Sequence, residues 1–202
     1  MVIREIWAWI GGFLLVMLVS ALTLGLTSPP LMAGLYMMAL KRYRGEEIGP
    51  GDVFQGFSRF LESWGLTIIT AIPALLLMAP MMILVAIPMM QAQTGGDIED
   101  VATGVAVGVQ LLMPVLWLVV MAIQTIFFYS WVLVADGHGA WESVTRSWEK
   151  VGNNYWSYLG MWLVLTIIAS IGSYACYVGI LVSYPLLPCA QVAAYMWHFR
   201  RV

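Results

Sequence analysis

The chain has 202 residues, of which 61% are hydrophobic and 10% are charged, and its formal net charge at pH 7 is −2. Soluble domains carry about 25% charged residues, so this charge content argues against a soluble globular protein, and the lack of a basic run argues against nucleic acid as a partner. We therefore predict a single integral membrane domain over 1–202. Its expected fold is all-α, a polytopic helical membrane bundle of six transmembrane segments and two short cytoplasmic interfacial helices.

The first two predicted spans form a hairpin. An apolar run over 6–27 continues beyond the point where a signal peptide would be cleaved, so we expect a retained membrane helix. The second arm, over 30–42, is short, because at ~1.5 Å per residue its apolar part covers about half of a ~30 Å bilayer core. Proline lacks a backbone N–H, so Pro29 and Pro30 predict the break between the arms, and this backbone should be buried against other helices.

Residues 52–64 have apolar side chains at helical spacing and predict a short amphipathic helix with Asp52 as its N-cap. We expect it to lie in the membrane interface with its aromatic side down, or to pack on the protein's own cytoplasmic surface. Its apolar side should hold Val53, Phe54, Phe57, Phe60, Leu61 and Trp64.

A third span is predicted over 65–90. Its three prolines indicate a kinked helix, and we interpret its five methionines as gap fillers rather than as a copper path.

A polar, acidic segment over 91–100 precedes the fourth span, which is predicted over 106–135. The apolar run itself extends over 101–135, which is too long for one perpendicular crossing, so we expect a tilted helix or first turns that lie outside the membrane core. Asp136 and Gly137 predict the helix end and a turn, and we prefer this interpretation to acid–base chemistry with His138.

A second amphipathic helix is predicted over 140–151, with Trp141, Val144, Trp148 and Val151 on its apolar side. It too should lie in the interface with its aromatic side down, or pack on the protein's own surface. The last two spans are predicted over 154–175 and 178–197.

Charge segregation predicts the topology. Six crossings with both termini in the cytoplasm put all nine Lys and Arg on the cytoplasmic side, in agreement with the positive-inside bias. We therefore expect a multi-pass membrane protein whose N- and C-termini are cytoplasmic. The basic residues are Arg4, Lys41, Arg42, Arg44, Arg59, Arg146, Lys150, Arg200 and Arg201. A belt of tryptophans near the same boundary comprises Trp7, Trp9, Trp64, Trp141, Trp148, Trp156 and Trp197.

The sequence shows no candidate catalytic or metal-binding group. No predicted span has a charged residue near its middle, and Cys176 and Cys189 lack neighbours at metal-ligand spacing. We expect Gln124 and Gln191 to hydrogen-bond across helices, although either side chain, like Gln110, could instead line a polar cavity. We therefore predict no catalytic residue, no metal site, no cofactor and no enzymatic activity.

Short motifs resemble those of the YciC-like group, uncharacterised bacterial polytopic inner-membrane proteins. The resemblance implies a six-span inner-membrane protein and supplies no catalytic residue. The motifs are Pro30-Leu31, Gly34-Leu35, Arg44-Gly45, Asp52-Val53-Phe54-Gln55-Gly56-Phe57, Val134-Ala135-Asp136-Gly137, Ala140-Trp141-Glu142-Ser143, Ser147-Trp148, and the ending from Gly179 to Pro185 with Ala194-Tyr195.

Two functions fit these observations. The first is a non-catalytic scaffold or accessory subunit that packs against other membrane proteins of a larger complex, since the spans carry no polar relay. The second is a small-molecule transporter or lipid-handling membrane protein. It is suggested by Tyr36 and Tyr195, which follow Pro29 and Pro188 at the same offset, as in a duplicated hairpin. This second function needs a polar cavity inside the membrane.

Overall fold

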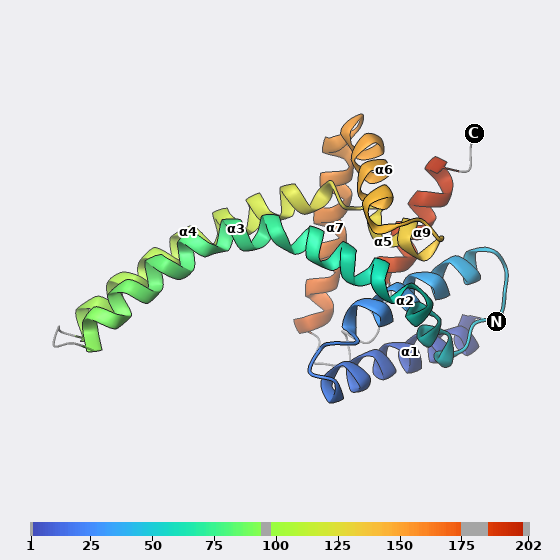
Figure 1. Ribbon diagram of the computed structural model, residues 1–202, viewed down its shortest axis with the longest axis horizontal. Coiled ribbons are helices and arrows are strands. Elements are labelled where there is room, and N and C mark those ends of the chain that lie inside the picture. Colours follow the sequence, from blue (N-terminus) through green and yellow to red (C-terminus); the bar gives the residue numbers. More distant parts are fainter. Residues whose placement is uncertain (1, 94–97, 175–185, 200–202) are drawn as a thin grey trace. The chain divides into compact units, whose positions relative to one another are not determined.

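The computed structural model describes residues 2–93, 98–174 and 186–199, and every regular element within these ranges is a helix, as Figure 1 shows. The predicted all-α fold is therefore confirmed for this part of the chain. The chain divides into two compact units, of which unit 1 comprises Met1–Thr67 and Thr125–Val202 and unit 2 comprises Ile68–Gln124. The elements are α1 (Val2–Leu22), α2 (Ser28–Tyr43), the 3₁₀ helix η1 (Pro50–Arg59), α3 (Phe60–Gln93), α4 (Ile98–Thr125), α5 (Ser130–Ala135), α6 (Ala140–Gly152), α7 (Tyr155–Tyr174) and α9 (Leu186–Phe199).

The bend between α1 and α2 lies before the two prolines, not at them as the sequence predicted. Leu24 and Gly25 adopt positive φ angles of 51° and 83°, and the Gly25 N–H donates to the Ser20 carbonyl at 2.7 Å. Pro29 and Pro30 stand in the first turn of α2, where a missing N–H breaks no intrahelical bond. Both prolines are buried, which confirms that part of the prediction.

η1 packs against α2 at very short backbone distance. A Cβ atom on Gly34 of α2 would overlap the Val53 carbonyl, and one on Gly56 of η1 would overlap the Pro30 carbonyl oxygen and the backbone of Gly34. Only glycine fits at both positions because each backbone fills the space that a side chain would need. This contact joins the first half of α2 to the middle of η1.

The fourth predicted span, 106–135, is not one continuous helix. It divides into α4 and α5, with a turn over 126–129 between them. The hydroxyl of Ser147, from α6, accepts a hydrogen bond from the Tyr129 N–H at 3.1 Å and donates one to the Ile126 carbonyl at 2.7 Å. This fully buried side chain thus satisfies two backbone groups that the helix break releases. The excess length of the apolar run is absorbed by a break rather than by a longer helix.

The remaining predicted ranges differ less from the structure. α7 matches the span predicted over 154–175, and α6 matches the amphipathic helix predicted over 140–151. α3 begins within the predicted amphipathic segment 52–64, which is divided between η1 and the first turns of α3. α9 covers the later part of the span predicted over 178–197, whose beginning falls outside the described residues.

The core of unit 1 is aromatic. Phe128 and Tyr129, in the turn before α5, meet Tyr158 of α7 at ring-centroid distances of 5.8 and 5.4 Å, and Tyr129 also meets Tyr195 of α9 at 6.2 Å. The turn between α4 and α5 is thus buried at the centre of the unit. The buried residues of this cluster are Tyr36, Ala39, Leu40, Phe128, Tyr129, Val132, Leu133, Val151, Tyr158, Val192, Tyr195 and Met196.

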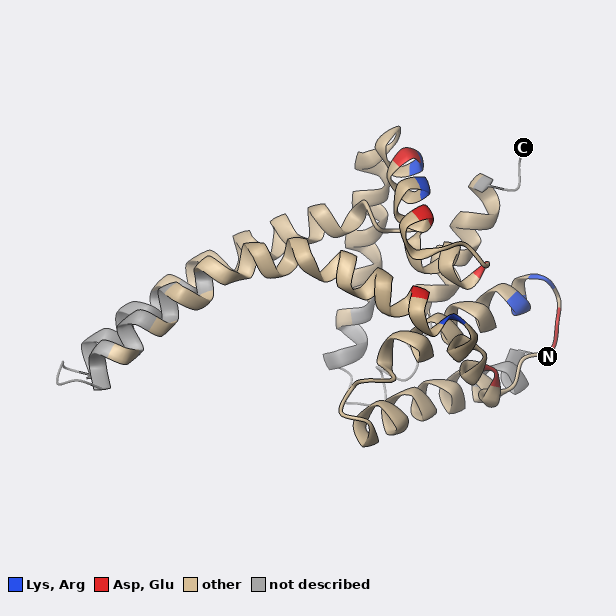
Figure 2. Ribbon diagram, viewed as in Figure 1, with Lys and Arg blue, Asp and Glu red and all other residues tan. Residues whose placement is uncertain are grey.

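Unit 2 is a helical hairpin formed by α3 and α4, which run along each other in opposite directions (Figure 1). The Gln124 side-chain NH₂ donates to the Thr70 carbonyl at 3.1 Å, which confirms the predicted cross-helix bond of this glutamine. The sequence has no charged residue over 68–93 or 101–124, and the described ribbon of unit 2 is correspondingly uncoloured by charge in Figure 2. The large apolar side chains exposed in this unit are Ile68, Ile72, Leu75, Leu76, Met82, Ile83, Met90, Leu111, Leu112, Met113, Val115, Trp117, Leu118 and Val119.

One described helical stretch, Pro50–Pro80, is long and apolar enough to cross a membrane. Only 11% of its most apolar 18-residue window is buried within the protein, whereas the core helix of a soluble protein would be mostly buried. The described apolar stretches Trp7–Leu22, Gln110–Thr125 and Tyr155–Ile168 are shorter than that length.

Candidate functional site

α2 and α5 end in the same way. Each C-cap residue is followed by a glycine with a left-handed backbone, Gly45 with φ 85° and Gly137 with φ 109°. The N–H of each glycine donates to the carbonyl three residues earlier at 3.1 Å, and the next N–H donates to the carbonyl five residues earlier. This pair of bonds is the Schellman motif, in which glycine avoids the strain of the left-handed conformation. The helix end and turn predicted at Asp136 and Gly137 are therefore confirmed.

The C-cap residues of these two helices form an ion pair. Arg44 Nη2 donates to Asp136 Oδ1 at 2.5 Å, and the Tyr195 hydroxyl of α9 donates to the other carboxylate oxygen at 2.9 Å. We call Arg44, Asp136 and Tyr195 the Asp136 cluster. It joins α2, α5 and α9 through one carboxylate whose two oxygens both accept charge-assisted or phenolic hydrogen bonds.

A second carboxylate secures the start of η1. Asp52 accepts hydrogen bonds from the Lys41 ammonium at 3.0 Å, the Gly49 N–H at 2.8 Å and the Gln55 side chain at 2.6 Å. The predicted N-cap role was wrong in position, since Gly49 is the N-cap and Asp52 stands at N3, from where its carboxylate caps the Gly49 N–H. Burial alone would raise the pKa of Asp52, but the hydrogen bond from Gly49 and the hydrogen bond and charge of Lys41 outweigh it and lower that pKa.

His138 has partners other than Asp136. Its Nδ1 lies 3.2 Å from the Leu133 carbonyl and its Nε2 lies 3.0 Å from Arg146 Nη1. Because a guanidinium only donates, Nε2 is the acceptor and Nδ1 carries the proton that faces the carbonyl. Arg146 also pairs with Glu142 at 2.7 Å along α6. The geometry gives His138 a role in holding the turn before α6 rather than in proton transfer with Asp136.

η1 sorts its residues into three rows. A 3₁₀ helix has three residues per turn, so side chains three apart lie one above another. One row packs against α2, the second is polar and the third is aromatic. The rows are Val53 with Gly56, then Asp52 with Gln55 and Ser58, and finally Phe54 with Phe57 and, at the start of α3, Phe60.

The aromatic row, which we call the phenylalanine row, is exposed. The rings of Phe54 and Phe57 stack at 6.3 Å and those of Phe57 and Phe60 at 6.5 Å, yet each side chain keeps about two fifths of its surface exposed. The sequence predicted Val53 on the same side as these rings, but Val53 is fully buried. The error follows from the assumed helical period, since 3.6 residues per turn places together side chains that 3.0 residues per turn separates.

The apolar residues of the amphipathic helix α6 divide between its packed side and its exposed surface. Its packed side combines Val144 and Val151 with the serines Ser143 and Ser147, and all four are buried. Trp141 and Trp148 were predicted on the same side as the valines, but they are 69% and 59% exposed. The small residues allow α6 to approach the protein closely, and the two indoles remain outside that contact.

The glutamines of the predicted spans have different environments. Gln191 is buried, and its Oε1 accepts a hydrogen bond from the Tyr36 hydroxyl of α2, so its predicted cross-helix bond is confirmed. Gln110 is exposed on α4.

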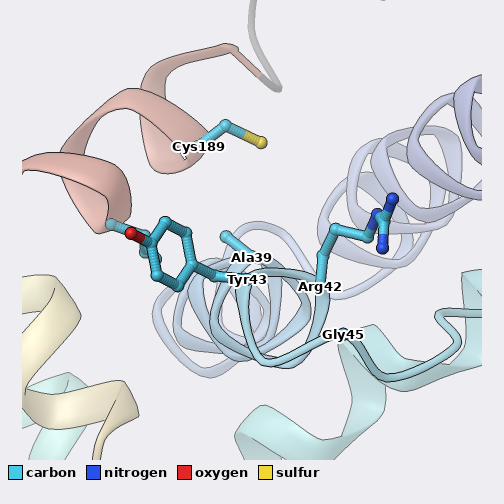
Figure 3. A pocket seen from close by; sticks show the side chains of 6 residues that line it. Ala39, Arg42, Tyr43, Gly45 and Cys189 are labelled. Atoms are coloured by element: carbon cyan, nitrogen blue, oxygen red, sulfur yellow. The ribbon is translucent and has the colours of Figure 1, made fainter. Parts of the chain in front are cut away.

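An open recess lies between the end of α2 and α9, with a volume of about 470 Å³ (Figure 3). Sequence reasoning did not identify it, because its two walls are about 150 residues apart in the chain and neither carries a recognisable motif. Its lining comprises Ala39, Arg42, Tyr43, Gly45, Cys189 and Val192.

Among the described residues, no group of three or more His, Cys, Asp or Glu side chains is placed to hold a metal ion. The ionisable side chains described above act as caps and helix-to-helix ties. The predictions about catalysis and cofactors remain predictions.

A profile described as "Domain of unknown function (DUF7847)" matches residues 6–198 of the chain. No curated protein and no solved structure matches the chain.

Proposed function

The chain belongs to the DUF7847 family, and from this premise we propose that it is a non-catalytic, multi-pass protein of the bacterial cytoplasmic membrane that acts as a scaffold or accessory subunit for other membrane proteins. Its resemblance to the YciC-like group is part of the same proposal. Both termini face the cytoplasm, and six segments cross the bilayer.

The exposed apolar surface supports the membrane location. In water, leaving a large apolar side chain exposed forgoes about 1.5–3 kcal/mol of burial free energy, whereas in a bilayer such a side chain is already in an apolar solvent. The stretch Pro50–Pro80 is long, apolar and mostly uncovered by the protein itself. Unit 1 also has large apolar side chains that the protein leaves exposed, among them Leu14 and Leu18 on α1 and Ile167 on α7.

The distribution of charge supports the proposed topology. Within unit 1, the charged residues coloured in Figure 2 lie around the end of α2, in η1, at the start of α3 and from the end of α5 through α6. α7 has no charged residue. In the proposed arrangement these charged parts lie at the cytoplasmic surface, with exposed tryptophans at the same boundary, as expected for an aromatic belt. The exposed tryptophans assigned to this boundary are Trp7, Trp141, Trp148, Trp156 and Trp197, whereas the exposed Trp117 belongs to α4.

One observation carries the scaffold role. The ionisable groups of the Asp136 cluster and around Asp52 are engaged in ties between helices, while both helices of unit 2 keep large apolar side chains exposed. A protein with no polar relay in its described spans and a long apolar hairpin is suited to packing against other membrane proteins.

Photo-crosslinking in native membranes tests this proposal. A photoreactive amino acid at Leu76 or Trp117, both exposed in unit 2, should give discrete crosslinks to one or a few proteins, whereas the same probe at Leu133, fully buried in unit 1, should give none. Crosslinks to lipid alone from both exposed positions, together with a stable monomer in mild detergent, would contradict the scaffold role. Release of the protein by alkaline carbonate would contradict the membrane location.

The recess between α2 and α9 favours a second candidate, a lipid-handling membrane protein. Transport of a small solute is supported less, because Gln124 and Gln191 are hydrogen-bonded to other helical segments and neither lines this recess.

A further inference from the structure

We infer that the hairpin of α1 and α2 is re-entrant: it enters the bilayer at the cytoplasmic face, ends among the lipid acyl chains and returns to the same face. We call Leu22, Leu24 and Leu26, at the end of this hairpin, the leucine tip. The inference rests on the membrane location proposed above. It replaces the first two proposed crossings by one hairpin and leaves both termini and the basic end of α2 on the cytoplasmic side.

The turn between α1 and α2 exposes its leucines and covers its hydroxyl groups. The side chains of the leucine tip are 76%, 93% and 63% exposed. By contrast, the half-buried Thr23 hydroxyl donates to the Val19 carbonyl at 2.8 Å and accepts a hydrogen bond from the Thr27 hydroxyl at 2.6 Å. A turn in water normally presents polar side chains to the solvent. The reversed arrangement fits a turn whose solvent is hydrocarbon.

The backbone donors of this turn are satisfied within the turn itself. Lipid offers no hydrogen-bond partner, so a turn can enter the hydrocarbon region only if the protein pairs its backbone groups. Five consecutive or nearly consecutive N–H groups donate to carbonyls of residues 19–25 at 2.7–3.3 Å. These donors, which need no water, belong to Thr23, Leu24, Gly25, Leu26 and Ser28.

The identity of residue 24 also indicates an apolar surrounding. Leu24 has a φ of 51°, in the left-handed region that is strained for a leucine and that glycine, asparagine or aspartate usually occupy in turns. In water, an exposed leucine would gain nothing that offsets this strain. Among acyl chains its side chain is removed from water, and the transfer free energy favours leucine over a polar residue.

The length of α2 places the turn inside the membrane core. The rise from Ser28 to Lys41 is about 20 Å at ~1.5 Å per residue, and the hydrocarbon core is ~30 Å thick. Lys41 and Arg42 stand in the last turn of α2 and lie at the cytoplasmic boundary in the proposed topology. The leucine tip then ends within the core, short of the opposite surface.

The polarity of the hairpin agrees with this placement. Leu14 and Leu18 precede Leu22 at intervals of four residues, so the exposed side of α1 continues the apolar surface of the tip. The ion pairs of α2 lie at its other end, where Lys41 meets Asp52 and Arg44 meets Asp136. The hairpin therefore has a charged base and an apolar tip.

Spin-label accessibility tests the inference in the full-length protein, without its native cysteines and reconstituted in phospholipid nanodiscs. A nitroxide at Leu24→Cys is compared with one at Glu46→Cys, in the loop after α2. We expect the ratio of oxygen accessibility to nickel-chelate accessibility to be about fivefold higher at Leu24→Cys, because a label in the ~30 Å hydrocarbon core is shielded from the chelate. A label at Leu76→Cys, exposed in unit 2, reports on the membrane location independently.

The outcomes separate the hairpin from the membrane location. Equal nickel accessibility at Leu24→Cys and Glu46→Cys, with Leu76→Cys shielded, would place the tip in water and overturn the re-entrant hairpin alone. Low accessibility to both reagents at Leu24→Cys would show a tip covered by protein and overturn the lipid contact. Nickel access at Leu76→Cys as well would overturn the membrane location. Labelling of Glu46→Cys by an impermeant maleimide in intact cells would overturn the cytoplasmic face.

The substitution Leu24→Asn has opposite effects in the two solvents. Asparagine tolerates the left-handed conformation better than leucine, so in water the substitution would raise the melting temperature. In hydrocarbon the amide group loses its water without gaining a partner. We expect the melting temperature in nanodiscs to fall by about 2–4 °C. Glu47→Asn, in the loop after α2, should leave it unchanged. A melting temperature of Leu24→Asn that rises or stays constant would overturn the lipid placement of the tip.

Discussion

Arg44 and Asp136, which are 92 residues apart in the chain, pair as the C-cap residues of two helices that both end in a Schellman motif. Each is followed by the glycine that makes its helix end possible, Gly45 and Gly137. Two C-cap residues of opposite charge, each at a helix end that the local sequence specifies, therefore form one tertiary contact. Tyr195 completes it from the last described helix.

Removing the charge of this pair should destabilise the protein. We expect Asp136→Asn to lower the free energy of unfolding by about 1–2 kcal/mol, since the carboxylate loses the charge that strengthens its two hydrogen bonds. Thermal unfolding in detergent measures the effect. In a double-mutant cycle, Arg44→Gln should cost little more in the Asp136→Asn background, and strict additivity of the two losses would contradict the pairing. Glu149→Gln, an exposed acid of α6 outside the pair, serves as the control.

The contact between η1 and α2 gives the sharpest stability prediction. Gly34→Ala should destabilise the protein by more than about 3 kcal/mol or prevent folding, because the new methyl group overlaps backbone atoms that cannot move aside. Gly160→Ala, in the interior of α7, meets no atom within 4 Å and should be neutral or stabilise by up to about 1 kcal/mol. Expression level and melting temperature in detergent compare the two variants. Similar behaviour of both would disprove the close approach.

Asp52 predicts a specific acid sensitivity. Its pKa is lower in the folded protein than the ordinary value of 3.8, so the folded state favours the ionised carboxylate. The resulting stabilisation is complete well above pH 3.8 and is lost as the pH falls from there through the folded-state pKa. The melting temperatures of the wild type and Asp52→Asn should differ at pH 7 and converge below pH 3.8. A difference that stays constant with pH would show that the carboxylate charge has no part in this stabilisation.

The phenylalanine row predicts which side of η1 meets lipid. A spin label at Phe57→Cys, in a background without native cysteines, should be more accessible to oxygen than to a water-soluble nickel chelate when the protein is in nanodiscs. The matched label at Ser58→Cys, on the polar row, should show the reverse order. Equal nickel accessibility at the two positions would mean that the row faces water or is covered by protein.

Much of the helix layout follows from local sequence. Uncharged apolar runs predict α1, α3 and α7 because helices satisfy their own backbone groups. Pro29 and Pro30 correctly predicted buried backbone, but they begin α2 and do not form the bend before it. The turn at Asp136-Gly137 was equally predictable, since glycine after a helix is a local signal that needs no partner. The recess between α2 and α9 carries no such local signal.

Two features were decided by the tertiary structure. The break between α4 and α5 lies in an apolar run and depends on Ser147, whose hydroxyl arrives from α6 to satisfy the released backbone groups. The 3₁₀ geometry of η1, which separates Val53 from the phenylalanines, accompanies its close contact with Gly34 of α2. These outcomes were beyond sequence reasoning because each depends on a group from a distant part of the chain.

The sequence alone determined that this protein is helical, that its apolar runs are largely free of charge and that its basic residues cluster at helix ends, because backbone hydrogen bonding and charge placement are local properties. Only the tertiary structure decided that Arg44 meets Asp136, that Tyr36 meets Gln191 and that Arg42 borders a recess with α9. Such pairings depend on how helices pack, and packing is set by shape complementarity between segments that the order of residues does not place side by side.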